Sequence, residues 1–145
     1  DNVVARPIGQ LTRSLYAAPS YVKRFGMPQS REALGQHRLL TNTASPTLNR
    51  WASRRDGAEV LARGHTRTDN TAVVVALLLS GVGIARIVDV VALPLVNTGA
   101  LVPILSNEFA TDPVPMFAVM LQERHRLPKV RACIDHWADW LSRNS

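Results

Sequence analysis

Short apolar runs alternate with helix-like segments along almost all of this 145-residue chain, and this alternation limits the possible folds more than any other feature. Runs rich in β-branched residues predict strands, whereas the segments between them have the caps and the apolar spacing of helices. Strands and helices in alternation predict an α/β fold with a mostly parallel sheet. The expected strands cover 15–18, 37–41, 65–69, 83–88, 100–105 and 114–121, and the expected helices cover 31–36, 71–80, 89–99 and 128–144.

Turn and cap residues mark where several of these elements begin and end. Residues 48–64 predict a hairpin that turns at an Asp-Gly pair. Asp69 or Asn70 is expected to cap the helix that follows them, and Asp89 the next helix, because short polar side chains accept hydrogen bonds from the first helical N–H groups.

The glycines near residue 80 do not form a dinucleotide-binding loop. Such a loop needs a strand, then G-x-G-x-x-G, then a helix whose amino terminus receives the pyrophosphate. Here Gly81 and Gly83 follow a helix and precede a strand, and Arg86 stands at the third glycine position. We therefore expect Gly81 to end the helix in a left-handed conformation and Gly83 to allow a tight turn into the strand.

The formal net charge of +6 permits attraction to polyanions but does not by itself indicate nucleic-acid binding. The basic residues, Arg13 and Arg86 among them, are scattered along the chain. The short clusters at 54–55 and 124–126 do not repeat along a helix face. We therefore interpret the excess charge as solvated surface.

Little in the sequence points to catalysis, to a metal or to a membrane. Cys133 and His136 lie three residues apart on the last expected helix, but the apolar stripe of that helix places Cys133 in the core. We expect no cofactor and no metal, since G-x-S-x-G and P-loop motifs are missing from the sequence. A single cysteine favours a reducing cytoplasm, and the longest nearly uncharged run, 71–85, is too short to span a bilayer.

Three stretches of the chain carry the pattern of a known family, namely VVARPIGQLTRSLYAAPSYVKRFGMPQSREALGQHRLL (3–40), SGVGIARIVDVVALPLVNTGALVPIL (80–105) and VPMFAVMLQERHRLPKVRACIDHWADWL (114–141). In this order they resemble the effector-binding domain of LysR-type transcriptional regulators, and the likeness covers essentially the whole chain. The chain departs from the family pattern where Asp69 replaces the usual Asn and Cys133 the usual Phe.

The resemblance implies an α/β, periplasmic-binding-protein-like fold, in which two lobes are joined by two crossing strands and a small effector lies in the cleft. This chain is expected to hold the second lobe and the C-terminal return to the first. Residues 1–13 would end the first effector subdomain, 14–113 would form the second, and 114–145 would supply the return strand and C-terminal helix of the first. The crossings are expected at 15–18 and 116–120, and the N-terminal winged helix-turn-helix of the family is expected to be absent from this chain.

The resemblance also suggests where an effector and a partner would bind. Polar groups at strand ends and helix amino termini that face the cleft are the physical candidates, and free N–H groups there favour an anionic molecule. Ordinary capping and surface turns are the competing interpretation of the same residues. The candidate effector contacts are Ala18, Pro19, Ser20, Thr41, Asn42, Thr68, Asp69 and Asn70, and the candidate dimer contacts, on the apolar helix over 71–79, are Val74, Leu77 and Leu78.

The last helix carries an apolar stripe that the resemblance places against the first subdomain. Because exposing the stripe is costly, we expect other sequence or another chain to cover it, with Trp140 at the rim of the contact. The stripe consists of Val130, Cys133, Ile134, Trp137 and Leu141.

These observations predict the effector-binding and dimerisation module of a LysR-type bacterial regulator that works in the cytoplasm. Its expected partners are a small-molecule effector and further copies of itself, as a dimer or tetramer, with DNA bound only through the absent domain and no membrane contact. Two alternatives stay open. A stand-alone basic nucleic-acid-binding domain would show a steep salt dependence of binding, and a fragment of an α/β enzyme would lose turnover on His136→Ala.

Overall fold

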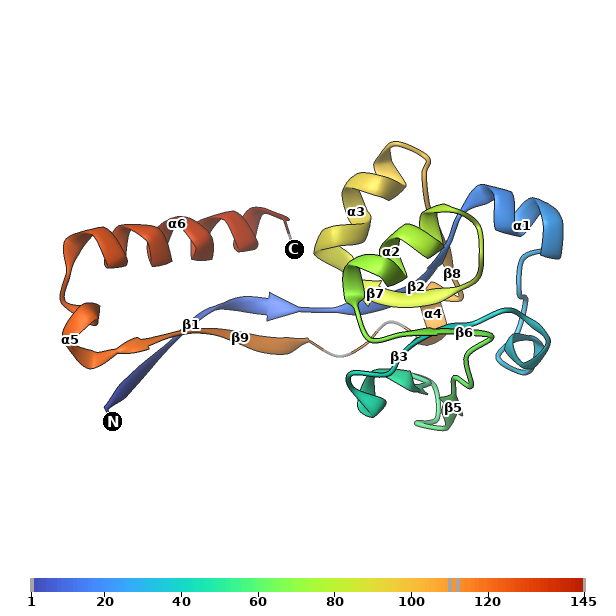
Figure 1. Cartoon of the computed structure of the whole chain (residues 1–145), viewed down its shortest axis with the longest axis horizontal. Coiled ribbons are helices and arrows are strands. Elements are labelled where there is room, and N and C mark those ends of the chain that lie inside the picture. Colours follow the sequence, from blue (N-terminus) through green and yellow to red (C-terminus); the bar gives the residue numbers. More distant parts are fainter. Residues whose placement is uncertain (1, 110, 112, 145) are drawn as a thin grey trace. The chain divides into compact units, whose positions relative to one another are not determined.

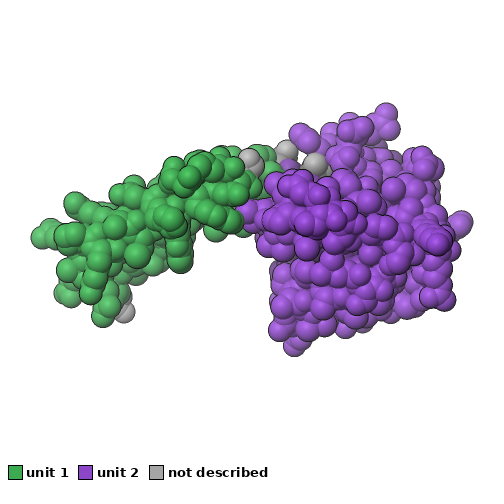
Figure 2. All heavy atoms as spheres, turned by 90° about the horizontal axis from the view of Figure 1, so that it is seen from above, with its two compact units in different colours: residues 1–12, 112–145 green, residues 13–111 purple. Residues whose placement is uncertain are grey.

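The computed structural model describes residues 2–109, 111 and 113–144, and the chain divides into two compact units. Unit 1 comprises residues 1–12 and 112–145, and unit 2 comprises residues 13–111, shown in different colours in Figure 2. The unit boundaries thus follow residues 12 and 111, whereas the sequence predicted boundaries after residues 13 and 113. Strand β2 (Arg13–Ala17), which contains most of the crossing expected at 15–18, pairs with strands of unit 2, and strand β9 (Val114–Leu121), which contains the crossing expected at 116–120, pairs with a strand of unit 1.

Unit 1 is a helix packed on a two-stranded ribbon. Strand β1 (Val3–Leu11) runs antiparallel to β9, and after the short helix α5 (Gln122–His125) the helix α6 (Pro128–Asn144) lies along β1 (Figure 1). Pro128 fits the first turn because its missing N–H has no helical partner there. A Cβ at Gly9 would lie 3.2 Å from the Cβ of Leu141, so this glycine lets the helix approach the strand. Ile8, Ile134 and Leu141 form the small core of the unit.

Unit 2 contains a mixed α/β arrangement rather than a mostly parallel sheet. Strand β2 is central and runs antiparallel to both β7 (Ala85–Val88) and β8 (Val102–Ile104). Strand β3 (Leu40–Asn42) runs parallel to β6 (Thr66–Thr68), and a parallel bridge between Leu39 and Ile84 joins β3 to β7. The α/β class is confirmed, but "mostly parallel" is wrong, because β2 is bonded on both sides to strands that run the other way.

Helices cover one face of these strands and a hairpin covers the other (Figure 1). Helices α2 (Thr71–Leu79) and α3 (Asp89–Asn97) pack through Val74, Leu78 and Ala92 on one side. On the other side lies the hairpin of β4 (Arg50–Ala52) and β5 (Glu59–Leu61), whose Trp51 is fully buried. The remaining elements are the helices α1 (Pro19–Phe25) and α4 (Ser106–Phe109) and two 3₁₀ turns, η1 (Glu32–Gln36) and η2 (Pro46–Asn49).

The helix ends follow the predicted residues at most positions. Gly81 has a φ of 74° just after α2, so the prediction for this glycine is confirmed. At Gly83 the structure shows a close backbone approach rather than a left-handed turn, since a Cβ there would lie 2.6 Å from the carbonyl oxygen of Arg38. Asn70 caps α2, since its Oδ1 accepts hydrogen bonds from the N–H groups of Ala72 and Val73. Asp89 does not cap α3, because it is the first helical residue.

No helix in the part of the chain that the structure describes combines the length and the apolar content needed to cross a bilayer.

Candidate functional site

Polar residues gather where the parallel strands β3 and β6 end. The register places Asn42 opposite Thr68, and α2 begins just after Asn70. The Nδ2 of Asn42 donates to the Oγ1 of Thr71 at 3.3 Å, and the N–H of Asn70 donates to the Oγ1 of Thr68 at 3.2 Å. These bonds hold the strand ends against the first turn of α2. The structure therefore brings together five of the predicted contacts, which are Thr41, Asn42, Thr68, Asp69 and Asn70.

Burial divides those five residues. Thr41 is buried, and its hydroxyl group lies against Gly64, where a side chain would not fit. Asp69 and Asn70 are exposed, and the Asn70 side chain is already occupied by the cap. Asn42 and Thr68 are half-buried at the strand ends.

The other three predicted contacts lie at the opposite end of the sheet. Because β2 runs antiparallel to β7, its end at Ala17 lies beside the beginning of β7, whereas Arg13 lies beside Val88. The hydroxyl group of Ser20 lies against Gly81, just beyond the end of α2, whereas Asn70 caps its beginning. Ala18, Pro19 and Ser20 therefore cannot share one site with Asn42 and Thr68 inside unit 2.

A small pocket of about 180 Å³ lies at the end of the sheet where β3 and β7 finish. We call it the polar pocket. Of the eight predicted contacts, only Asn42 lines it. The backbone N–H of Asn42 donates to Asn49 Oδ1 at 2.9 Å, and Asn49 Nδ2 returns a bond to the carbonyl of Asn42 at 2.7 Å, so these two residues fix η2 against β3. The lining residues are Arg13, Leu40, Asn42, Leu48, Asn49, Trp51, Thr71, Val74, Arg86, Ile87 and Val88.

Two arginines that line this pocket were not among the candidate site residues predicted from the sequence. Arg13 and Arg86 were interpreted as solvated surface, but both are half-buried. An Nη2 of Arg86 donates to the carbonyl of Leu48 at 3.1 Å, while its Nε is buried without a hydrogen-bond partner among the described residues. Burial and the charge of Arg13 lower the pKa of Arg86. The signal in the sequence was an arginine inside the otherwise apolar strand over 83–88.

Two of the three predicted dimer contacts are buried in the core of unit 2, and the third is partly exposed. Leu78 is 0% exposed, Val74 is buried, and Leu77 packs partly into the same cluster. Because Val74 and Leu78 are buried within unit 2, their side chains are not accessible to a partner in this structure. The large apolar residues that α2 exposes are Val73 and Leu79.

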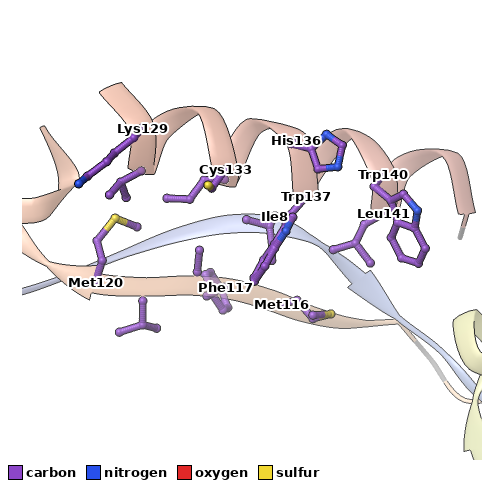
Figure 3. Close-up of a pocket in the computed structure, with 14 residues that line it drawn as sticks. Ile8, Met116, Phe117, Met120, Lys129, Cys133, His136, Trp137, Trp140 and Leu141 are labelled. Atoms are coloured by element: carbon purple, nitrogen blue, oxygen red, sulfur yellow. The ribbon is translucent and has the colours of Figure 1, made fainter. Parts of the chain in front are cut away.

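Unit 1 has a second hollow, an open apolar groove of about 940 Å³ between α6 and β9. Figure 3 shows side chains of α6 above the groove and those of β9 below it. The predicted stripe splits here, because Ile134 and Leu141 are buried whereas Trp137 is 62% and Trp140 46% exposed. Cys133, expected in the core, is exposed.

Within 2–109, 111 and 113–144, His, Cys, Asp and Glu side chains nowhere gather in threes as a metal site requires. His37 lies 2.6 Å from the hydroxyl group of the buried Tyr21, which is a structural contact.

Comparison with known proteins gives one consistent result. Residues 1–142 match the family model of the LysR substrate binding domain. The HTH-type transcriptional activator TtdR of Escherichia coli K12 is 29% identical over 143 residues, which are 97% of this chain and 46% of that protein. The HTH-type transcriptional regulator CrgA of Neisseria meningitidis serogroup C is 29% identical over 129 residues, 88% of this chain and 43% of that protein. The chain thus spans less than half the length of these relatives.

Solved structures agree with the sequence relatives. The regulatory domain of CrgA from Neisseria meningitidis, a LysR-type transcriptional regulator, superposes with a TM-score of 0.88 at 26% identity, covering 96% of this chain and 69% of that one. The regulatory domain of AphB from Vibrio vulnificus gives a TM-score of 0.74 at 29% identity, covering 95% and 69%.

Proposed function

The chain belongs to the LysR substrate-binding domain family, and from this premise we propose that it senses a small molecule through the polar pocket of unit 2. The observation that carries the proposal is the position of that pocket, at the carboxyl ends of β3 and β7 and beside the first turn of α2. Ligands of open α/β sheets bind outside the carboxyl ends of the strands.

The pocket joins elements that are distant in the sequence, so a ligand there would affect several of them at once. Arg13 on β2, Asn49 on η2 and Arg86 on β7 all line it. A molecule that binds one arrangement of these elements more tightly than another shifts the population toward that arrangement. This is the physical means by which a sensing domain would alter the activity of the protein that contains it.

DNA binding is proposed to reside outside this chain. The relatives are helix-turn-helix regulators rather than enzymes, and the chain covers less than half of their length. We place the whole regulator in the cytoplasm, where bacterial DNA lies, and expect it to act as a homo-oligomer.

The experiment uses the full-length regulator and the DNA that it selects from random duplexes. Fluorescence anisotropy measures DNA affinity with and without each member of a metabolite library. Val88→Trp fills the polar pocket, and Val73→Trp, at an exposed position on α2, is the matched control. We expect a compound that changes the DNA affinity of the wild type and of Val73→Trp but leaves Val88→Trp unaffected. A response that persists in Val88→Trp, or the lack of any responding compound, would contradict the proposal.

A further inference from the structure

The polar pocket holds two positive charges that no described residue neutralises. Its lining, as far as the structure describes it, contains no aspartate or glutamate. The ion pairs found in the described part of the chain use other arginines, namely Arg6, Arg31, Arg50 and Arg143. The pocket is therefore electropositive.

Strand register brings the two guanidinium groups to one face of the sheet. Leu15 on β2 lies opposite Arg86 on β7, and Arg13 is two residues from Leu15. Because side chains alternate along a strand, Arg13 and Arg86 project from the same face as diagonal neighbours. Diagonal Cα atoms lie about 7–8 Å apart, a separation that long side chains can close around one small anion.

Arg86 has hydrogen-bonding capacity that the protein does not use. Its Nε is buried and unpartnered among the described residues, while one Nη is held by the carbonyl of Leu48. A buried N–H without an acceptor destabilises the protein, and a charged one does so more strongly. An anion placed between the arginines would accept from this N–H and also relieve the repulsion between the two charges.

The rest of the wall favours an organic acid over an inorganic anion. Leu40, Val74 and Val88 give the pocket an apolar side, which would remain unfilled beside a bare phosphate ion. The volume of about 180 Å³ is smaller than the roughly 300–1,000 Å³ of drug-sized sites, so the ligand must be small.

We propose that the polar pocket binds a short organic carboxylate, whose carboxylate group bridges Arg13 and Arg86. The carbon chain lies against the apolar side of the pocket. The guanidinium fork suits this role because its N–H groups match the two oxygens of a carboxylate. This assignment rests on the proposed sensing function and adds to it the chemical class of the effector and the residues that select it.

The test is calorimetric titration of the full-length regulator with short mono- and dicarboxylates, from acetate to adipate, and with the neutral amide of each. We expect at least one acid to bind, and its amide to bind at least about 30-fold more weakly, as for loss of one partner of a buried charge pair. Arg86→Gln and Arg13→Gln should each lower the affinity by a similar factor. Arg67→Gln, an exposed arginine on β6, removes the same charge and should leave affinity unchanged.

Four results would overturn the proposal: an amide that binds as well as its acid, inorganic phosphate that binds in place of every acid, a folded Arg13→Gln with wild-type affinity, or no acid bound at millimolar concentration. The acid–amide comparison uses only wild-type protein, so it tests the proposal even if the Arg86→Gln variant does not fold. A neutral compound that changes DNA affinity and is blocked by Val88→Trp would reject the carboxylate class and leave the sensing function standing.

Discussion

At the scale of single residues, the contact between Tyr16 and Asp89 fastens α3 to the central strand. The hydroxyl group of Tyr16 donates to Asp89 Oδ1 at 2.6 Å. The sequence predicted Asp89 as a helix cap because an aspartate before an apolar helix commonly has that role. Its actual partner is 73 residues away, on a strand. No local pattern identifies such a partner.

The Tyr16 contact predicts a specific loss of stability at alkaline pH. Burial and the Asp89 carboxylate raise the pKa of Tyr16 above its ordinary value of 10.0. The folded state thus holds this proton more tightly than the unfolded state, so the stabilisation is complete below about pH 10 and is lost as pH rises beyond it. Tyr16→Phe has no proton to lose there. Urea unfolding across this range should show a shallower alkaline decline for Tyr16→Phe than for the wild type.

Burial also raises the pKa of Tyr21, so this residue contributes a part of the alkaline loss of stability that wild type and Tyr16→Phe share. Equal declines in wild type and Tyr16→Phe would mean that Tyr16 ionises as freely in the folded as in the unfolded state.

The arginine pair shows the same limit of sequence reasoning at this scale. Arg13 and Arg86 are far apart in the chain, and only the pairing of β2 with β7 makes them neighbours. A scattered basic residue is solvated in most proteins, so the surface interpretation followed the general tendency. The residue pattern of 83–88 predicted a strand correctly. That pattern does not determine which other strand pairs with it.

At the scale of elements, segments with strong local patterns were predicted well. The Asp56-Gly57 hairpin, α2, α3 and the start of α6 at Pro128 follow from turn residues, caps and apolar spacing. The prediction of a mostly parallel sheet was wrong at β2, because strand direction depends on where the chain enters the sheet rather than on its residues. The division of the α6 stripe into buried and exposed parts likewise depends on what packs against the helix.

The cap of α2 gives a prediction that separates two adjacent residues. Asn70→Ala removes the acceptor of two N–H groups in the first turn and should lower the free energy of unfolding by about 1 kcal/mol. Asp69→Ala, at the exposed neighbouring position, should change it by no more than about 0.5 kcal/mol. Urea denaturation of both variants measures the difference. A larger loss of unfolding free energy for Asp69→Ala than for Asn70→Ala would show that Asn70 is not the residue that caps α2.

At the scale of the whole molecule, the apolar groove of unit 1 requires a cover. Trp137 and Trp140 are largely exposed on α6, and Phe117 and Val119 on the facing strand are exposed as well. Burying a large apolar side chain stabilises a protein by roughly 1.5–3 kcal/mol. An uncovered groove of this kind would also promote association. We expect the groove to be covered in the full-length regulator, as the sequence stripe predicted.

Tryptophan fluorescence measures this covering. The emission of full-length wild type minus that of the Trp137→Phe, Trp140→Phe double variant isolates these two residues from the buried Trp51. A blue-shifted difference spectrum that resists quenching by iodide is the expected result. A red-shifted, freely quenched difference would show that α6 faces water in the whole protein.

Amide hydrogen exchange of the full-length regulator shows whether the effector binds in the polar pocket. Exchange is compared with and without the compound that changes DNA affinity. We predict slower exchange at residues 42–49, in the first turn of α2 and at 86–88, the segments that line the polar pocket. Slower exchange confined to β9 and α6 of unit 1, with no change at the segments that line the polar pocket, would contradict effector sensing by that pocket.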